Sequence, residues 1–125
     1  IELSGTEMAT VDYADGLPVH TNHFLSHLKD KPDQPANPEL ENSLVRHKRG
    51  STLIQQLDAN AGIPQMQSIL ADGDDAQHPI CRPYKPRLEF MVGTVSSVMM
   101  DLPSQRLHVT RGSPEQSPYE QFSLR

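Results

Sequence analysis

Two histidines and an asparagine stand close together near the start of the chain, within residues 17–25. Asn22 lies between His20 and His23, where a run of strand-forming residues ends. A carboxamide offers two N–H donors without a charge, and such a donor held at a strand end stabilises the oxyanion formed when an amide or thioester carbonyl is attacked. No attacking group stands beside it, because the one cysteine is Cys81 and the first residue is not a nucleophile. We interpret the segment as part of a catalytic site whose nucleophile lies elsewhere.

These residues also have simpler interpretations. Asparagine at a turn or strand end usually satisfies nearby backbone groups. His20, His23 and His27 are spaced by three and four residues, as zinc ligands on a helix face would be, and Asp30 is the one evident further ligand. However, the β-branched neighbours favour an extended segment, in which His20 and His23 point to opposite faces. We therefore expect no metal site, and assign His20 and His23 to substrate contact or to orienting the loop.

Cys81 and Arg82 form the second group of interest. A lone cysteine is most often a small buried apolar residue, whereas a nucleophilic role needs a lowered pKa, which the charge of Arg82 favours. For Arg82 the simpler role is to pin a loop. Ser96 and Ser97 lack the Gly-x-Ser-x-Gly elbow, which argues against a serine hydrolase triad. The basic run at residues 46–49 is typical of a solvated helix face.

Composition narrows the classes of protein. The hydrophobic fraction is 35%, below the roughly 45–50% (glycine included) of a self-contained globular domain, so we expect a piece of a larger fold or long polar loops. The net charge of −5, without a dense basic stripe, argues against nucleic-acid binding. No apolar run approaches the roughly 20 residues of a membrane span, and we expect no signal peptide. The compartment stays open, with the cytoplasm favoured.

The order of elements predicts an α+β fold. We expect strands in residues 1–28, a linker in 29–37, helices in 38–72, a loop in 73–89, a β-hairpin in 90–111 and a polar tail in 112–125. In the first region the second strand covers residues 8–13, Asp15-Gly16 turns the chain, and residues 17–24 return.

The helical region begins at Asn37-Pro38-Glu39, where asparagine caps the first turn. Apolar residues at a 3.6-residue period predict a helix from Pro38 to Asn60, weakened or broken at Gly50, and a shorter helix from Pro64 to Ala71.

Residues 90–102 predict one strand that is buried on both faces, because apolar residues occur at both parities. Residues 103–105 turn the chain, and residues 106–111 return with Leu107 and Val109 facing inward. Residues 78–84 are too rich in proline for regular structure.

The chain resembles the acyltransferase-like N-terminal-nucleophile hydrolase family, of the isopenicillin N acyltransferase type. The resemblance is carried by Val19-His-Thr-Asn-His23, by Arg46-His47-x-Arg49, and by Ile80-Cys81-Arg82 with the following Ser97-Val-Met-Met-Asp101 and Gly112-Ser-Pro114. Their order and spacing match the C-terminal third of that family and span nearly the whole chain. The resemblance implies the C-terminal portion of an αββα sandwich, with antiparallel strands, one long helix and one short helix.

The resemblance also implies an autoprocessed precursor with an N-terminal cysteine nucleophile, acting on linear amides or acyl thioesters such as acyl-CoA, without a cofactor. Asn22 matches the family's oxyanion-hole asparagine, and Arg82 is similar to an arginine of the active-site shell. The family's nucleophile lies upstream of the region seen here, so we expect the chain alone to be inactive and its partner to be the N-terminal part of the precursor. The alternative is a small α+β interaction module with no chemistry of its own.

Overall fold

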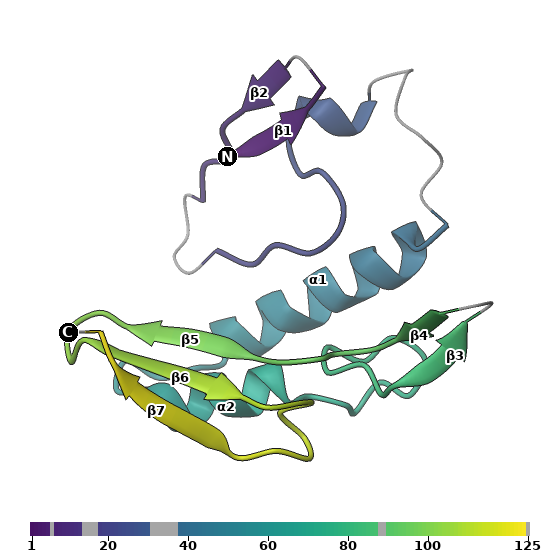
Figure 1. Cartoon of the computed structure of the whole chain (residues 1–125). Helices are drawn as coiled ribbons and strands as arrows, with labels where there is room; N and C mark the ends of the chain where they lie inside the picture. Colours follow the sequence, from purple (N-terminus) through teal and green to yellow (C-terminus); the bar gives the residue numbers. More distant parts are fainter. Residues whose placement is uncertain (6, 14–17, 31–37, 88–89, 125) are drawn as a thin grey trace. The chain divides into compact units, whose positions relative to one another are not determined.

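The structure is a computed structural model of the chain and describes residues 1–5, 7–13, 18–30, 38–87 and 90–124. Its described elements are two α-helices, a 3-10 helix and seven strands in three antiparallel sheets, which confirms the α+β class (Figure 1). The chain divides into two compact units, unit 1 (Ile1–Gln55) and unit 2 (Gln56–Arg125).

Unit 1 holds a short hairpin, a 3-10 helix and the longer α-helix. Strands β1 (Glu2–Ser4) and β2 (Glu7–Ala9) pair antiparallel, followed by η1 (His27–Asp30) and α1 (Leu40–Gln55). The hairpin confirms strands near the N-terminus, but β2 ends at Ala9, so the longer strand predicted for residues 8–13 is wrong. The predicted Asp15-Gly16 turn, the Asn37 cap and linker residues 31–37 lie outside the described residues.

The predicted returning strand is also wrong, because residues 18–25 have no strand structure. Pro18 has no N–H to donate to a ladder, and the partners of the following backbone are side chains. Buried backbone groups need hydrogen bonds, but side chains supply them as well as a neighbouring strand does. Asn22 therefore lies in a bend of an irregular loop and not at a strand end.

The prediction of a long and a short helix is confirmed, with different bounds. Helix α1 begins two residues later than Pro38 and ends five residues before Asn60, and it continues through Gly50 without a break. Ser43 and Gly50 are its buried positions, seven residues apart and therefore on one face, whereas Leu40 and Leu44 are exposed. In unit 2, α2 (Ile63–Leu70) is preceded by its N-cap residue Gly62, whose N–H donates to Gln65 Oε1 over 3.0 Å.

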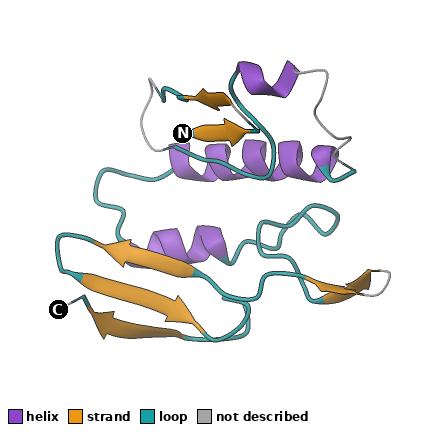
Figure 2. Cartoon of the chain, turned by 45° about the horizontal axis from the view of Figure 1, so that its top comes forward, coloured by secondary structure: helices purple, strands orange, loops and turns teal. Residues whose placement is uncertain are grey.

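The predicted hairpin of unit 2 is partly correct. Residues 90–102 are divided between β4 (Phe90–Val92) and β5 (Val98–Asp101), which belong to different sheets. Strand β4 pairs with β3 (Lys85–Arg87), in a region predicted to be a loop. Strand β5 pairs with β6 (Arg106–Thr110) as predicted, and β7 (Tyr119–Ser123) adds a third strand where a polar tail was predicted. Figure 2 shows α2 beside this three-stranded sheet.

The interruption between β4 and β5 has a local cause. A Cβ at Gly93 would lie 2.8 Å from the Cα of Tyr84, so the chain there passes too close to its neighbour for a side chain. Arg82 and Thr94 then bond reciprocally, the Arg82 N–H to Thr94 Oγ1 over 2.9 Å and the Thr94 N–H to the Arg82 carbonyl over 2.8 Å. The segments around Arg82 and Thr94 therefore pair through these two bonds, and strand β4 does not continue into β5.

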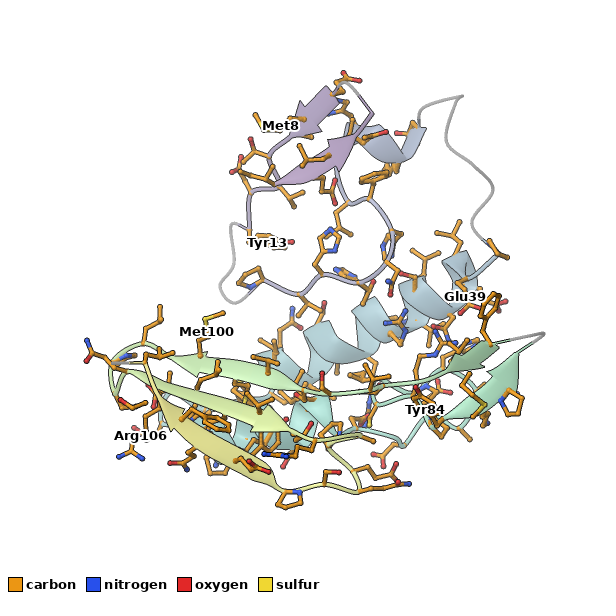
Figure 3. All side chains as sticks on the ribbon, in the orientation of Figure 1. Met8, Tyr13, Glu39, Tyr84, Met100 and Arg106 are labelled. Atoms are coloured by element: carbon orange, nitrogen blue, oxygen red, sulfur yellow. The ribbon has the colours of Figure 1, made fainter. Side chains whose placement is uncertain are left out.

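The three-stranded sheet buries polar side chains and exposes apolar ones. His108 and Thr110 are buried, whereas the predicted inward residues Leu107 and Val109 are only half-buried. On the face of Leu107 and Val109, the register also places Val98, Met100 and Phe122, all exposed. We call these five residues the apolar sheet face. Figure 3 shows Met100 and Arg106 projecting on opposite sides of the sheet. The predicted strand buried on both sides is therefore wrong.

Candidate functional site

The loop that carries Asn22 is fixed to helix α1 through one serine. The hydroxyl of Thr21 donates to the Ser43 carbonyl over 2.9 Å, and the backbone N–H of Asn22 donates to Ser43 Oγ over 2.8 Å. Nδ1 of His23 lies 2.9 Å from the same Oγ atom. Ser43 has no exposed surface, so these bonds are shielded from water and hold three consecutive loop residues to one turn of the helix.

A buried carboxylate fixes the same loop from the other side. Glu2 accepts hydrogen bonds from the backbone N–H groups of Leu25 (2.7 Å) and Ser26 (2.9 Å), and its Oε1 lies 2.7 Å from Nε2 of His20. Burial alone would raise the pKa of Glu2, but the hydrogen bonds from Leu25, Ser26 and His20 outweigh it and lower the pKa to about 2. Glu2 is therefore an anion that closes the loop onto β1; we call this arrangement the Glu2 clamp.

His20 serves the clamp with both ring nitrogens. While Nε2 faces the Glu2 carboxylate, Nδ1 lies 2.6 Å from the carbonyl oxygen of Thr21. Both neighbours of the ring are acceptors, so His20 holds the loop and neither nitrogen is available to a substrate. A substrate could therefore contact only the carbon atoms of the His20 ring, because the side chain is partly exposed.

The side chain of Asn22 is oriented by an arginine of helix α1. Nη2 of Arg46 donates to Asn22 Oδ1 over 2.7 Å, and Nε of Arg46 donates to Asn42 Oδ1 over the same distance. Because a guanidinium only donates, the amide oxygen of Asn22 faces Arg46 and the NH₂ end is directed elsewhere. The positive charge also polarises the amide and makes its N–H groups better donors.

Asn22 lines a small cavity in unit 1. The cavity has a volume of about 250 Å³ and is lined by Ile1, Glu2, His20, Asn22, His23 and Phe24. Its wall combines the apolar side chains of Ile1 and Phe24 with one carboxamide, one carboxylate and two imidazoles, so that polar groups converge on an apolar surface as they do in ligand sites. The structure thus brings together three of the four site residues predicted from the sequence.

His23 differs from His20 in its electrostatic setting. Burial lowers the pKa of His23 below its ordinary value of 6.5, and the nearby His47, His20 and Arg46 lower it further, against the opposing charge of Glu2. Its ring meets that of His47 edge to face, with centroids 5.5 Å apart. His23 is therefore a neutral imidazole at pH 7, in the wall of the cavity.

The fourth predicted residue, Arg82, belongs to unit 2. It is half-buried, and its backbone is fixed to Thr94 as described above. The adjacent Cys81 is 1% exposed, and its Sγ lies 3.0 Å from Ser113 Oγ, which agrees with the expectation of a buried small residue. His27 is paired with Glu7 over 3.6 Å. Within the described residues, no group of three or more His, Cys, Asp or Glu side chains is placed to hold a metal ion.

Three residues that shape the site were not assigned to it from the sequence: Glu2, Ser43 and Arg46, although Arg46 belongs to the motif Arg46-His47-x-Arg49. Their contacts join residues 18 to 24 positions apart, and no local pattern reveals such pairs. Arg46 carried the one usable signal, since Asn42 and Arg46 stand four apart and therefore meet on a helix surface.

A search against protein-family models and a search of curated proteins each found no match to this chain. Among the described residues, no helix is long and apolar enough to cross a membrane.

Proposed function

We propose that this chain is the C-terminal part of an N-terminal-nucleophile acyltransferase or amidohydrolase that acts on linear amides or acyl thioesters. In this proposal, Asn22 donates to the developing oxyanion, and the cysteine nucleophile belongs to the upstream part of the precursor. The chief support is the fixed amide of Asn22, whose oxygen is engaged by Arg46 over 2.7 Å and which lines the cavity.

The chemistry of that amide suits an oxyanion donor. A donor that is already oriented needs no reorganisation when charge develops on the carbonyl oxygen, which is the main source of such stabilisation. Asn22 is held at two points, its backbone N–H by Ser43 and its side-chain oxygen by Arg46. The guanidinium behind the amide adds a favourable potential for a negative oxygen.

Arg82 keeps the role suggested by the resemblance, which is to support the nucleophile or an acidic group of the substrate. Its backbone is bonded in both directions to Thr94, so its Cα is well anchored within unit 2. Without the upstream nucleophile, we expect the chain alone to turn over neither amides nor thioesters.

The test is Asn22→Ala in the full-length protein, assayed on amide and thioester substrates. Loss of one oxyanion donor typically lowers kcat by about 10²–10³-fold, and we expect that loss with an unchanged circular dichroism spectrum. Asn60→Ala, at an exposed turn asparagine, is the matched control. Near-normal kcat for Asn22→Ala would contradict the oxyanion role.

A second candidate function is an α+β interaction module without chemistry of its own. The observation that favours it is the apolar sheet face, on which Met100 is 67% exposed and Val98 52% exposed. Exposed apolar faces of this kind are typical of protein interaction surfaces. The reading frame upstream of the Ile1 codon separates the two candidates: a cysteine processing site there supports the enzyme, and a start codon close to Ile1 supports the module.

A further inference from the structure

His23 occupies a position that the oxyanion role of Asn22 does not use. Its ring lines the same cavity, and its Nδ1 is bonded within the loop and helix α1. In the described part of the chain, Nε2 makes no hydrogen bond. The chemistry open to His23 therefore depends on which of the two nitrogens carries the proton.

The hydrogen bonds around Ser43 determine that tautomer. The Thr21 hydroxyl donates to the Ser43 carbonyl, and the Ser43 hydroxyl donates to Thr21 Oγ1 over 3.1 Å. Both hydroxyl protons are then used. Ser43 Oγ accepts from the Asn22 N–H and has one further lone pair, which faces Nδ1 of His23 at 2.9 Å.

This lone pair is filled when Nδ1 carries the proton. The set then contains four hydrogen bonds, and every polar atom of the Thr21 and Ser43 side chains is satisfied. If Nε2 carried the proton instead, Nδ1 would have to accept a hydrogen bond, either from Ser43 Oγ (2.9 Å) or from Thr21 Oγ1 (3.1 Å). The first choice takes the Ser43 proton away from Thr21 Oγ1, and the second takes the Thr21 proton away from the Ser43 carbonyl. Either choice leaves three hydrogen bonds in this part-buried set in place of four, so the Nδ1–H tautomer is favoured and Nε2 keeps a free lone pair.

We propose that Nε2 of His23 is the proton-transfer group of this cavity, acting on the water or amine that captures the acyl group. This role rests on the proposed function. In hydrolysis, the water oxygen forms a bond to the acyl carbon while its proton passes to Nε2. As the bond from the acyl carbon to the sulfur of the nucleophile breaks, Nε2 gives that proton to the sulfur, so that a free acid and a thiol result.

The charges around the ring suit a base that is unprotonated at neutral pH. The groups that face it are Arg46 and His47 from α1, His20 from the loop, and Glu2 from β1. Burial and the electrostatic effect of His47, His20 and Arg46 disfavour the imidazolium and keep the pKa of His23 below 6.5, whereas Glu2 opposes them. A general base works best when it is both neutral and oriented, and the Ser43 contact supplies the orientation.

The first experiment measures the tautomer in the ¹⁵N-labelled full-length protein, with His23→Gln used to assign the signals. Long-range ¹H–¹⁵N spectra at pH 7.5 are expected to show a proton on Nδ1 and none on Nε2, and a titration midpoint below 6.5. Ser43→Ala is expected to shift His23 toward the Nε2–H form, because the acceptor for Nδ1–H is lost. A native protein with Nε2–H at pH 7.5 would overturn the proposal.

The second experiment measures acyl turnover of the full-length protein against pH. We expect His23→Gln to lower kcat by about 10²–10⁴-fold and to remove the acidic limb of the profile, which a purely structural change would not do. His27→Gln, at an exposed histidine outside the cavity, is the matched control and should behave as the unchanged protein. Turnover that is unaltered in His23→Gln overturns this role alone. No turnover by the unchanged protein overturns the proposed function, and this role with it.

Discussion

The Glu2 clamp predicts how this protein responds to acid. In the folded chain the pKa of Glu2 is about 2, whereas its ordinary value is 4.5. A carboxyl group whose pKa is lower in the folded state stabilises that state above its unfolded pKa, and this stabilisation is lost as the pH falls through the folded pKa. The contribution of Glu2 is therefore complete at pH 7, begins to fall near pH 4.5 and is lost toward pH 2.

The size of the effect follows from these two values. A difference of one pKa unit corresponds to about 1.4 kcal/mol, so the clamp contributes up to about 3 kcal/mol at pH 7, of which about 2 kcal/mol is lost by pH 3. Glu2→Gln removes this contribution at once. The glutamine oxygen still accepts one donor, but its NH₂ group faces another N–H, and the stability should fall by about 2–3 kcal/mol at pH 7.

The assay is urea unfolding of the unchanged protein and Glu2→Gln at pH 7 and pH 3, with amide hydrogen exchange of Leu25 and Ser26 as the local measurement. We expect these two amides to exchange faster in the variant, and its stability to change less between the two pH values. Glu115→Gln, at an exposed position of unit 2, makes the same change of charge and is the control. Equal stability of Glu2→Gln and the unchanged protein at pH 7, or equal losses on acidification, would refute the reasoning.

Three further substitutions test the packing around the loop and the sheet. Ser43→Ala removes the shared partner of the loop residues and should cost about 1–3 kcal/mol, measured by urea unfolding. Gly93→Ala places a methyl group 2.8 Å from the Cα of Tyr84 and should cost about 1–3 kcal/mol, seen as a lower Tm. Tyr119→Phe removes the 2.7 Å bond from the phenol to the buried Ser97 hydroxyl and should cost about 1–2 kcal/mol without changing the strands, checked by unfolding and circular dichroism together.

The elements that the sequence predicted well are those with strong local signals. The helix of residues 40–55 has a periodic pattern, and the turn between β5 and β6 contains Pro103. The strand prediction for residues 90–102 failed because apolar content alone does not reveal a break. That break depends on the close approach of Gly93 to Tyr84, a contact nine residues apart in the sequence.

The candidate site was predictable in its residue types but not in its geometry. Asn22 and His23 stand out as polar side chains in an apolar setting, and both line the cavity. Their partners Ser43 and Arg46 lie 20 and 24 residues further along the chain, on helix α1. The strand predicted for residues 17–24 is absent from the described residues 18–24, because the oxygens of Ser43 and Glu2 accept hydrogen bonds from the backbone N–H groups of this loop. The sequence does not reveal these contacts.

The exposure of apolar side chains on the three-stranded sheet affects the solubility of the protein. Because apolar side chains such as Met100 and Phe122 are exposed to water, the protein should self-associate as its concentration rises. Light scattering should therefore rise as the sample is concentrated. Met100→Lys should raise the protein concentration at which turbidity appears.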